Sequence, residues 1–139
     1  MHSDLSCHSG TDKYKEPLRL VDAHHPSHSN PSQGRIEVCH DNRWGTVCNS
    51  HVSGSKNFTK VDAEVACFQL GFAGSVTTHP THQCQKETCA TSGDSWMHDV
   101  VCTGEEEYLT NCSFARPDED ECSISHTDDV IISCYGMLI

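Results

Sequence analysis

The sequence predicts a small α+β domain that is rich in disulfide bonds. One segment has the spacing and end signals of an α-helix, several short segments have the residues of antiparallel strands and their turns, and ten of the 139 residues are cysteine. Only 35% of the residues are hydrophobic and 6% aromatic, so covalent crosslinks are expected to make up for limited apolar burial. The length fits one domain over residues 18–135, with an N-terminal tail (1–17) held by Cys7 and a C-terminal tail (136–139).

The first strands are expected at residues 18–21 and on both sides of a tight turn within residues 34–48. Asp41 and Asn42 tolerate the positive φ that a two-residue hairpin loop requires, and this turn places Cys39 opposite Trp44. Cys39 and Cys48 then share one face of the hairpin, but their Cα atoms lie roughly 13 Å apart. A disulfide needs Cα atoms within about 7 Å, so the two cysteines require two different partners elsewhere in the chain.

One helix is predicted over about residues 60–70. Thr59 is a suitable N-cap with Asp62 three residues later, and Gly71 follows the last helical position. Val61, Val65 and Phe68 recur at helical spacing. The remaining chain is predicted as loop over 74–95, a strand over 96–101, a short helical turn over 105–111, an acidic loop, and a last strand over 130–134.

The cysteines and the charge indicate the compartment and the kind of partner. No two of the ten cysteines form a C-x-x-C pair, which argues against a redox-active dithiol and most structural zinc modules, and an oxidising compartment is expected. Asn57-Phe58-Thr59 and Asn111-Cys112-Ser113 fit the acceptor pattern for N-glycosylation. The formal net charge of −11 disfavours nucleic acid and anionic lipid as partners and favours cationic, calcium-bridged or neutral ones.

No sequence pattern of catalysis is present. The chain contains neither G-x-S-x-G nor H-E-x-x-H nor a phosphate-binding glycine loop. Glu105, Glu106 and Glu107 are interpreted as the solvated first turn of a helix rather than as an acid/base pair, because the helix dipole favours carboxylates there. The chain by itself is therefore not expected to be an enzyme.

Several motifs occur together in a fixed order. They are Leu18-Arg19-Leu20-Val21, Gly34-Arg35-Ile36-Glu37-Val38, Trp44-Gly45-Thr46-Val47-Cys48, the stretch Asp62 to Phe72, Trp96 to Cys102, Leu109 to Cys112, and His126-Thr127-Asp128-Asp129 before Cys134. In this order the sequence resembles a scavenger receptor cysteine-rich domain, over residues 18–134. The resemblance implies a curved antiparallel sheet that cradles one main helix.

The resemblance also implies disulfide pairs. Carried over residue by residue, it pairs Cys48 with Cys122, Cys67 with Cys134 and Cys102 with Cys112. Phe72 stands where one subgroup has another cysteine, so the chain resembles the six-cysteine subgroup with four additional cysteines. Of these, Cys7 is expected to pair with Cys39, and Cys84 with Cys89.

Two metal sites are considered. Several members of the family bind calcium through acidic residues, which suggests a cation site at Asp128, Asp129 and Asp99; Asn49-Ser50, however, replaces the first acidic pair. The alternative is that these acids are only solvated surface groups. His79, His82, Cys84 and Cys89 could supply a zinc set, but in an oxidising compartment the thiols are expected to be oxidised first. His126 is expected to orient backbone rather than act on a substrate.

The function that follows is an extracellular binding module, secreted or part of a membrane protein's ectodomain, within a larger multidomain protein. Its ligands would be proteins, glycans or other polyanionic or cell-surface molecules, bound with or without calcium, and no membrane contact by this chain is expected. The surface would be formed by loops 22–34, 49–57, 74–95 and 113–129, and the acidic loop 118–129 would contact a basic ligand. The alternatives are a non-catalytic accessory domain of a larger secreted enzyme, such as a protease or an amine oxidase, and a histidine-rich protein that binds transition metals.

Overall fold

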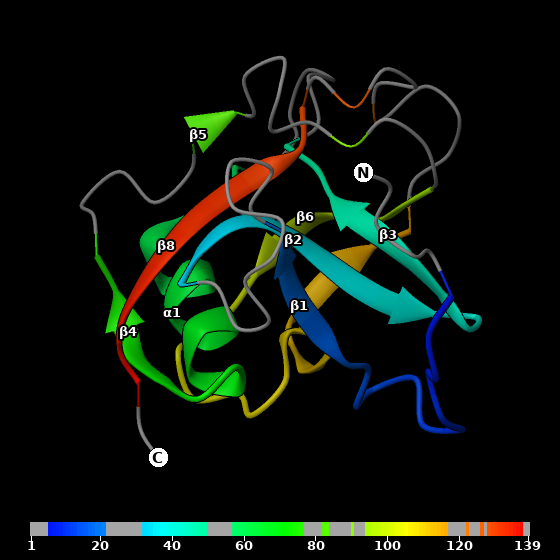
Figure 1. Cartoon of the computed structure of the whole chain (residues 1–139), viewed down its shortest axis with the longest axis horizontal. Helices are drawn as coiled ribbons and strands as arrows, with labels where there is room; N and C mark the ends of the chain where they lie inside the picture. The colour runs from blue at the N-terminus through cyan, green and yellow to red at the C-terminus, as the bar shows by residue number, and fades with distance from the viewer. Residues whose placement is uncertain are drawn as a thin grey trace.

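The computed structural model of the chain describes residues 6–21, 32–49, 57–76, 82–83, 90, 94–116, 122, 126 and 128–137. These residues form one main helix and a sheet of short strands (Figure 1). The strands are β1 (Leu18–Val21), β2 (Gln33–His40), β3 (Arg43–Val47), β4 (Phe72–Ser75), β5 (His82–Gln83), β6 (Ser95–Val101), β7 (Ser113–Ala115) and β8 (Val130–Met137). The helices are α1 (Lys60–Gln69) and the 3-10 turn η1 (Leu109–Asn111).

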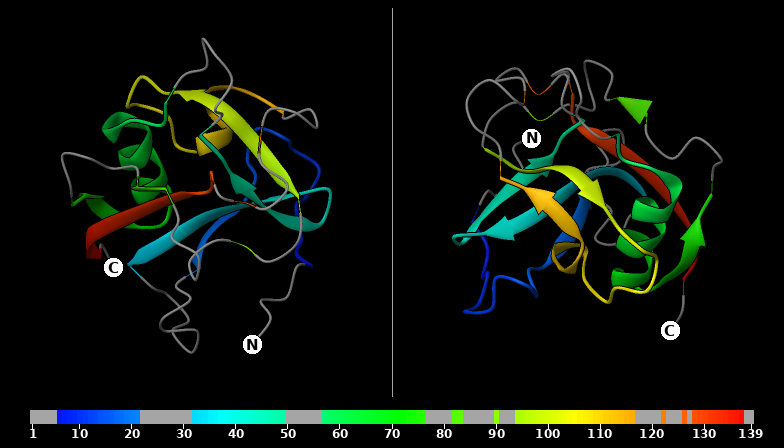
Figure 2. Two further views of the ribbon diagram at one scale, coloured as in Figure 1. Left: turned by 90° about the horizontal axis from the view of Figure 1, so that it is seen from above. Right: turned by 180° about the vertical axis from the view of Figure 1, so that it is seen from behind.

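The sheet runs in the order β4-β8-β2-β3-β6-β7, with β1 also paired to β2 and β5 to β8. Seen from above in Figure 2, it curls around the core, and α1 covers the open side between the β8 end and the β6 end. The curved sheet that holds one helix is therefore confirmed. One pairing differs from the expected antiparallel pattern: β3 and β6 run parallel, because the long connection through α1 brings the chain back in the same direction.

The hairpin of β2 and β3 has the predicted register. His40 lies opposite Arg43 and Cys39 opposite Trp44, and the turn residues Asp41 and Asn42 have φ of 52° and 61°. Gly45 is required for packing, since an added Cβ would lie 2.4 Å from Cδ1 of Trp96. The Trp96 indole Nε1 donates a hydrogen bond to the Arg43 carbonyl at 3.0 Å, which ties β6 to the hairpin.

Helix α1 begins and ends as the sequence predicts. Thr59 is the N-cap, and its backbone N–H donates to the Asp62 carboxylate at 2.8 Å. Of the three apolar residues at helical spacing, however, only Val65 is buried, while Val61 and Phe68 are 40% and 44% exposed. The helix instead packs through its smaller side chains, because the Cys67–Cys134 bridge draws that face close to β8.

The two faces of the central strands have different chemistry. On one face, the pairs Leu18–Val38 and Leu20–Ile36 lie in the hydrophobic core with Met97, Val100 and the buried face of α1. On the other face, Arg19 lies opposite Glu37, and Glu37 lies opposite Thr46. On β2, the second-face residues Arg35, Glu37 and Cys39 are buried as well, so the sheet is covered on both sides there.

Four disulfides join described cysteines: Cys7–Cys39, Cys48–Cys122, Cys67–Cys134 and Cys102–Cys112. They are the pairs expected from the resemblance and from the additional cysteines. Cys39 and Cys48 have separate partners, as the hairpin geometry requires. The expected Cys84–Cys89 pair lies outside the described residues.

The strands differ from the sequence prediction in two ways: one is longer than predicted, and two were not predicted. The last strand continues past Cys134 to Met137 and pairs with β4, so it enters the segment assigned as a C-terminal tail. β4 and β7 lie in segments for which no strand was predicted. They were missed because each is only three or four residues long and lacks regular alternation. No helix in the described parts of the chain is long and apolar enough to span a bilayer.

Candidate functional site

Three strands meet beside the Cys48–Cys122 disulfide, close to the acidic residues that the sequence suggested as a site. The Cys48 N–H donates to the carbonyl of Met97 in β6 at 3.0 Å. Cys48 also forms an isolated bridge with Asp129, directly before β8. Next to it, the Asn49 N–H donates to the Asp128 carbonyl at 2.8 Å. The end of β3, the first half of β6 and the start of β8 are thereby fixed to one another at a junction centred on Cys48.

The carboxylate of Asp129 is used to hold this junction together. The residue is 1% exposed, its Oδ2 accepts the backbone N–H of Ala90 at 2.9 Å, and its Oδ1 lies 3.1 Å from His126 Nδ1. Asp128 is 8% exposed. Asp128 and Asp129 are therefore not solvated surface acids, which was the alternative to a cation site. The Asp129 carboxylate is not available as a surface contact for a basic ligand.

His126 connects the junction to the second face of the sheet. It is buried, has a φ of 63°, and its Nδ1 lies 3.1 Å from Asp129 and 3.4 Å from Thr46 Oγ1. Because a carboxylate can only accept, Nδ1 carries the proton in the hydrogen bond to Asp129. Thr46 Oγ1 in turn lies 2.7 Å from Ser95 Oγ. The imidazole thus holds His126 itself in a left-handed backbone conformation, which is a structural task.

Asn49, which stands where the first acid of the family's calcium site is expected, has a structural role. Its Oδ1 accepts the backbone N–H of Phe58 at 2.8 Å, two residues before α1 begins. The side chain at this position therefore connects the end of β3 to the start of the helix.

The three proposed cation ligands do not converge. Asp99 has a φ of 52° and lies in a bulge of β6, with Oδ2 2.6 Å from Nδ1 of His98. Within the described part of the chain, the one group of three ligand-type side chains whose ligand atoms all lie within 4.8 Å is Cys102, Glu106 and Cys112. Asp99, Asp128 and Asp129 thus form no such group. The zinc alternative at His79, His82, Cys84 and Cys89 lies outside the described residues, apart from the backbone of His82 in β5.

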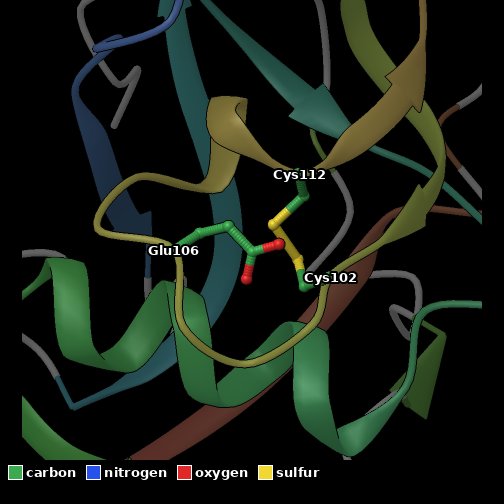
Figure 3. Close-up of side chains that lie close together, drawn as sticks. All are labelled: Cys102, Glu106 and Cys112. Atoms are coloured by element: carbon green, nitrogen blue, oxygen red, sulfur yellow. A yellow bond between two sulfur atoms is a disulfide. The ribbon is translucent and has the colours of Figure 1, made fainter.

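The Cys102, Glu106 and Cys112 group is not a metal centre in this state, because its two sulfur atoms are bonded to each other and neither is a thiolate (Figure 3). Glu106 does not start a helix as predicted, since the 3-10 turn begins only at Leu109. It folds back onto the preceding loop instead. Burial acts to raise the pKa of Glu106, but hydrogen bonds from the backbone N–H groups of Thr103, Glu106 and Gly104 outweigh it, and the pKa is held below its usual 4.5.

Comparison with known proteins identifies the family. Residues 27–135 match the scavenger receptor cysteine-rich (SRCR) domain. The chain belongs to this family.

Three similar proteins illustrate where SRCR domains occur. The chain is 37% identical over 119 residues to human (Homo sapiens) lysyl oxidase homolog 4, a match that covers 85% of this chain and 14% of that protein. Two solved SRCR domains are 28% identical: that of mouse MARCO in its dimeric form (TM-score 0.56, 73% of this chain and 85% of that chain) and the third SRCR domain of murine neurotrypsin (TM-score 0.55, 86% and 95%). The chain thus spans a small part of lysyl oxidase homolog 4 and nearly all of an isolated SRCR domain.

Two buried acids of this SRCR domain were not recognised in the sequence. Glu37 on β2 is 2% exposed; its Oε1 accepts from Arg19 at 2.6 Å and its Oε2 from Arg35 at 2.7 Å. Arg35 and Glu37 are two residues apart on one strand and so share a face, and Arg19 is the cross-strand partner of Glu37. The strand alternation could have identified this triad, although its acid would ordinarily be assigned to a solvent face.

The second missed acid is Glu16, in the segment assigned as a tail. It is 2% exposed, its Oε2 contacts His40 Nδ1, and its Oε1 accepts from Arg116 at 2.8 Å. Its backbone N–H donates to Thr110 Oγ1 at 3.3 Å. No local sequence pattern indicates this cluster, because its members are brought together from distant parts of the chain.

The two glycosylation acceptors are accessible. Asn57 and Asn111 are both exposed. Asn111 differs from Asn57 in that its Nδ2 donates to the carbonyl of Tyr14 at 2.7 Å. A glycan on Asn111 would therefore be attached to an atom that already holds the N-terminal segment.

Proposed function

We propose that the chain is an extracellular recognition module of a larger multidomain protein, and that it is not itself an enzyme. The observation that supports this best is the set of four disulfides distributed over a chain that covers only 14% of human lysyl oxidase homolog 4. Disulfides persist in oxidising compartments. A crosslinked scaffold also loses less conformational entropy on binding, which favours a recognition role.

The proposed ligand class is cationic protein segments rich in lysine. The formal net charge of −11 favours positively charged partners and opposes polyanions such as sulfated glycans. One relative is named as a lysyl oxidase homolog, and a lysyl side chain carries a positive charge, which fits an acidic accessory module beside such an enzyme. We therefore place the polyanionic ligands that the family also suggests second.

The contact is proposed at the four consecutive acids Asp118, Glu119, Asp120 and Glu121, within the acidic loop 118–129. Asp129 is excluded as the contact because its carboxylate already binds Ala90 and His126. Replacing Asp128 and Asp129 by alanine would therefore disturb the junction of β3, β6 and β8 rather than test a surface. A variant that neutralises residues 118–121 as amides is the sharper test.

The experiment measures binding of the oxidised domain to a lysine-rich peptide and, separately, to heparin. The unmodified domain should bind the peptide at low salt and lose affinity as salt rises, and neutralising residues 118–121 should weaken binding by tenfold or more, about 1.4 kcal/mol. The matched control neutralises four exposed acids elsewhere, Asp12, Asp41, Glu105 and Glu107, and should change binding less than threefold. Equal weakening in both variants would show a general charge effect and reject the loop as the site, and binding of heparin alone would reject the cationic ligand class.

Calcium assistance remains a separate proposal with its own measurement. Asp99, Asp128 and Asp129 do not form a group of ligands as they stand, so joint binding would require Asp129 to leave Ala90. We expect calcium at about 1 mM, the range of weak extracellular sites, to leave peptide binding and the melting temperature unchanged. Stabilisation by calcium that is lost in Asp128→Asn would reverse this expectation. A calorimetric titration with zinc and copper tests the histidine-based alternative in the same material.

The assignment to the six-cysteine subgroup is also part of this proposal. Phe72 is buried at the start of β4, in the place where another subgroup has a cysteine. A non-reducing peptide map that finds Cys84 linked to Cys89 would complete the proposed set of two additional bridges.

A further inference from the structure

The carboxylate of Glu106 lies against the Cys102–Cys112 disulfide (Figure 3). A Glu106 oxygen and the two sulfur atoms all lie within 4.8 Å of one another. The bridge closes the loop between β6 and η1, which is attached to α1 at two points: the Cys102 N–H donates to Asp62 Oδ1 at 2.8 Å, and the Leu109 N–H to Gln69 Oε1 at 2.7 Å.

Three short contacts hold the carboxylate in this place. The Thr103 N–H lies 2.9 Å from Oε2 and 3.1 Å from Oε1, and the Gly104 N–H lies 3.0 Å from Oε1. The same hydrogen bonds favour the ionised form. A fixed negative charge is therefore present beside the sulfur atoms at neutral pH. Glu105 and Glu107 on either side are exposed and are not part of the group.

Reduction of this bridge by an external thiol proceeds through negatively charged species. A thiolate attacks Sγ of one cysteine and forms a mixed disulfide, and the electron pair of the broken S–S bond leaves on the other cysteine as a thiolate, which is then protonated. A second external thiolate attacks the mixed disulfide and releases the first cysteine in the same way. In sum, two external thiols are oxidised to one disulfide and the protein bridge gains two electrons and two protons.

We propose that Glu106 protects the Cys102–Cys112 disulfide from anionic thiols, such as glutathione, by electrostatic repulsion. The carboxylate opposes the approach of the attacking thiolate and the charge that develops on the leaving sulfur. Two unit charges about 5 Å apart repel each other measurably even in water, and more strongly at a partly buried site. A glutathione thiolate, which carries an additional net negative charge, is repelled more than a zwitterionic cysteamine thiolate.

The test compares rates of reduction of this bridge in the folded chain and in Glu106→Gln. The rate is followed by quenching with an alkylating agent and by mass spectrometry of the peptides that contain Cys102 and Cys112. Three thiols of different charge are used: cysteamine, whose thiolate is net neutral, mercaptoethanol, whose thiolate is singly negative, and glutathione, whose thiolate is doubly negative at neutral pH. The glutamine side chain can still accept the N–H groups of Thr103 and Gly104, so the loop is expected to keep its conformation.

Glu106→Gln should accelerate reduction by glutathione about tenfold and by cysteamine only about twofold, and about 1 M salt should remove most of this difference. The matched controls Glu105→Gln and Glu107→Gln change the net charge equally and should alter the rates less than twofold. Equal acceleration with all three thiols would show that the loop had merely loosened and would overturn the proposal. Unchanged rates, or the same acceleration in the control variants, would overturn it as well.

Discussion

Replacement of Glu16 tests whether the N-terminal segment belongs to the folded unit. Glu16 precedes the predicted domain boundary at residue 18, yet its side chain is 3% exposed and contacts both His40 on β2 and Arg116 beyond β7. Arg116 also donates to the carbonyl of Trp96 at 3.1 Å, so the cluster connects the N-terminal segment to β2, to β6 and to the residue that follows β7. We expect Glu16→Ala to destabilise the whole domain.

The magnitude follows from the contacts that are lost. A hydrogen bond to a charged group contributes about 1.5–3 kcal/mol, and the lower end applies to the Arg116 contact because that side chain is 33% exposed. Loss of the His40 contact adds about 1–2 kcal/mol, since the imidazole nitrogen loses its buried acceptor. The free energy of unfolding should therefore fall by about 3 kcal/mol in Glu16→Ala. It should fall by about half as much in Glu16→Gln, because the amide oxygen still accepts from Arg116.

Urea denaturation without reductant measures this change with all disulfides intact, and the control is Glu107→Gln, an exposed glutamate for which a change within about 0.5 kcal/mol is expected. Deletion of residues 1–17 should be worse than Glu16→Ala, because it also removes Cys7 and leaves Cys39 unbridged. If Glu16→Ala and the deletion both unfold at the urea concentration of the unmodified chain, the segment is a tail after all and the cluster contributes nothing.

Three further predictions concern the crosslinks, pH and glycosylation. Removing the Cys67–Cys134 bridge, with its sequence separation of 67, should lower the free energy of unfolding by about 4 kcal/mol in the chain-entropy model, and removing Cys102–Cys112, with a separation of 10, by about 3 kcal/mol. Urea denaturation of the two double alanine variants checks this order of stability. The reverse order would argue against an entropic origin. Because folding lowers the pKa of Glu106, its ionised form stabilises the fold above pH 4.5, and this contribution is lost as pH falls further. Melting curves should therefore show that Glu106→Gln is less stable than the unmodified chain at pH 7 but not at pH 3. In secreted material, Asn57→Gln should remove one glycan in a deglycosylation gel shift, and an unchanged mobility would show that this acceptor is not used.

Much of the fold follows from local sequence patterns. The hairpin turn at Asp41-Asn42, the cap at Thr59 and the stop at Gly71 each depend on the conformational preference of one or two residues, and the structure has all three in place. Short strands such as β7 could not be predicted in this way. The partner of β7 is β6, on the other side of the loop that contains η1, and three residues are too few to display a period.

For the acidic residues near the end of the chain, the sequence predicted their position but not their surroundings. The sequence indicated where acidic residues cluster near the end of the chain, but the pattern alone could not distinguish a carboxylate that faces solvent from one that accepts a backbone N–H. Asp129 does the latter, and its partner Ala90 lies 39 residues away. In the same way, Glu16 and Glu37 are polar residues in polar or alternating contexts, and their burial results from arginines that the fold brings to them.

These buried ionic groups also bear on why the chain contains so many crosslinks. The second face of the central sheet carries Arg19, Arg35 and Glu37 instead of aliphatic side chains, and a buried ion pair adds little net stability because desolvation offsets much of the attraction. Such a triad instead fixes the register of β1 and β2, since a slip of one residue would move Arg35 and Glu37 together to the apolar face and separate Glu37 from Arg19. The stability of the fold therefore depends mainly on the single apolar face and on the disulfides. Oxidised material in which Glu37 is replaced by Gln should accordingly remain folded, whereas the same variant should unfold on reduction at a lower urea concentration than the reduced unmodified chain.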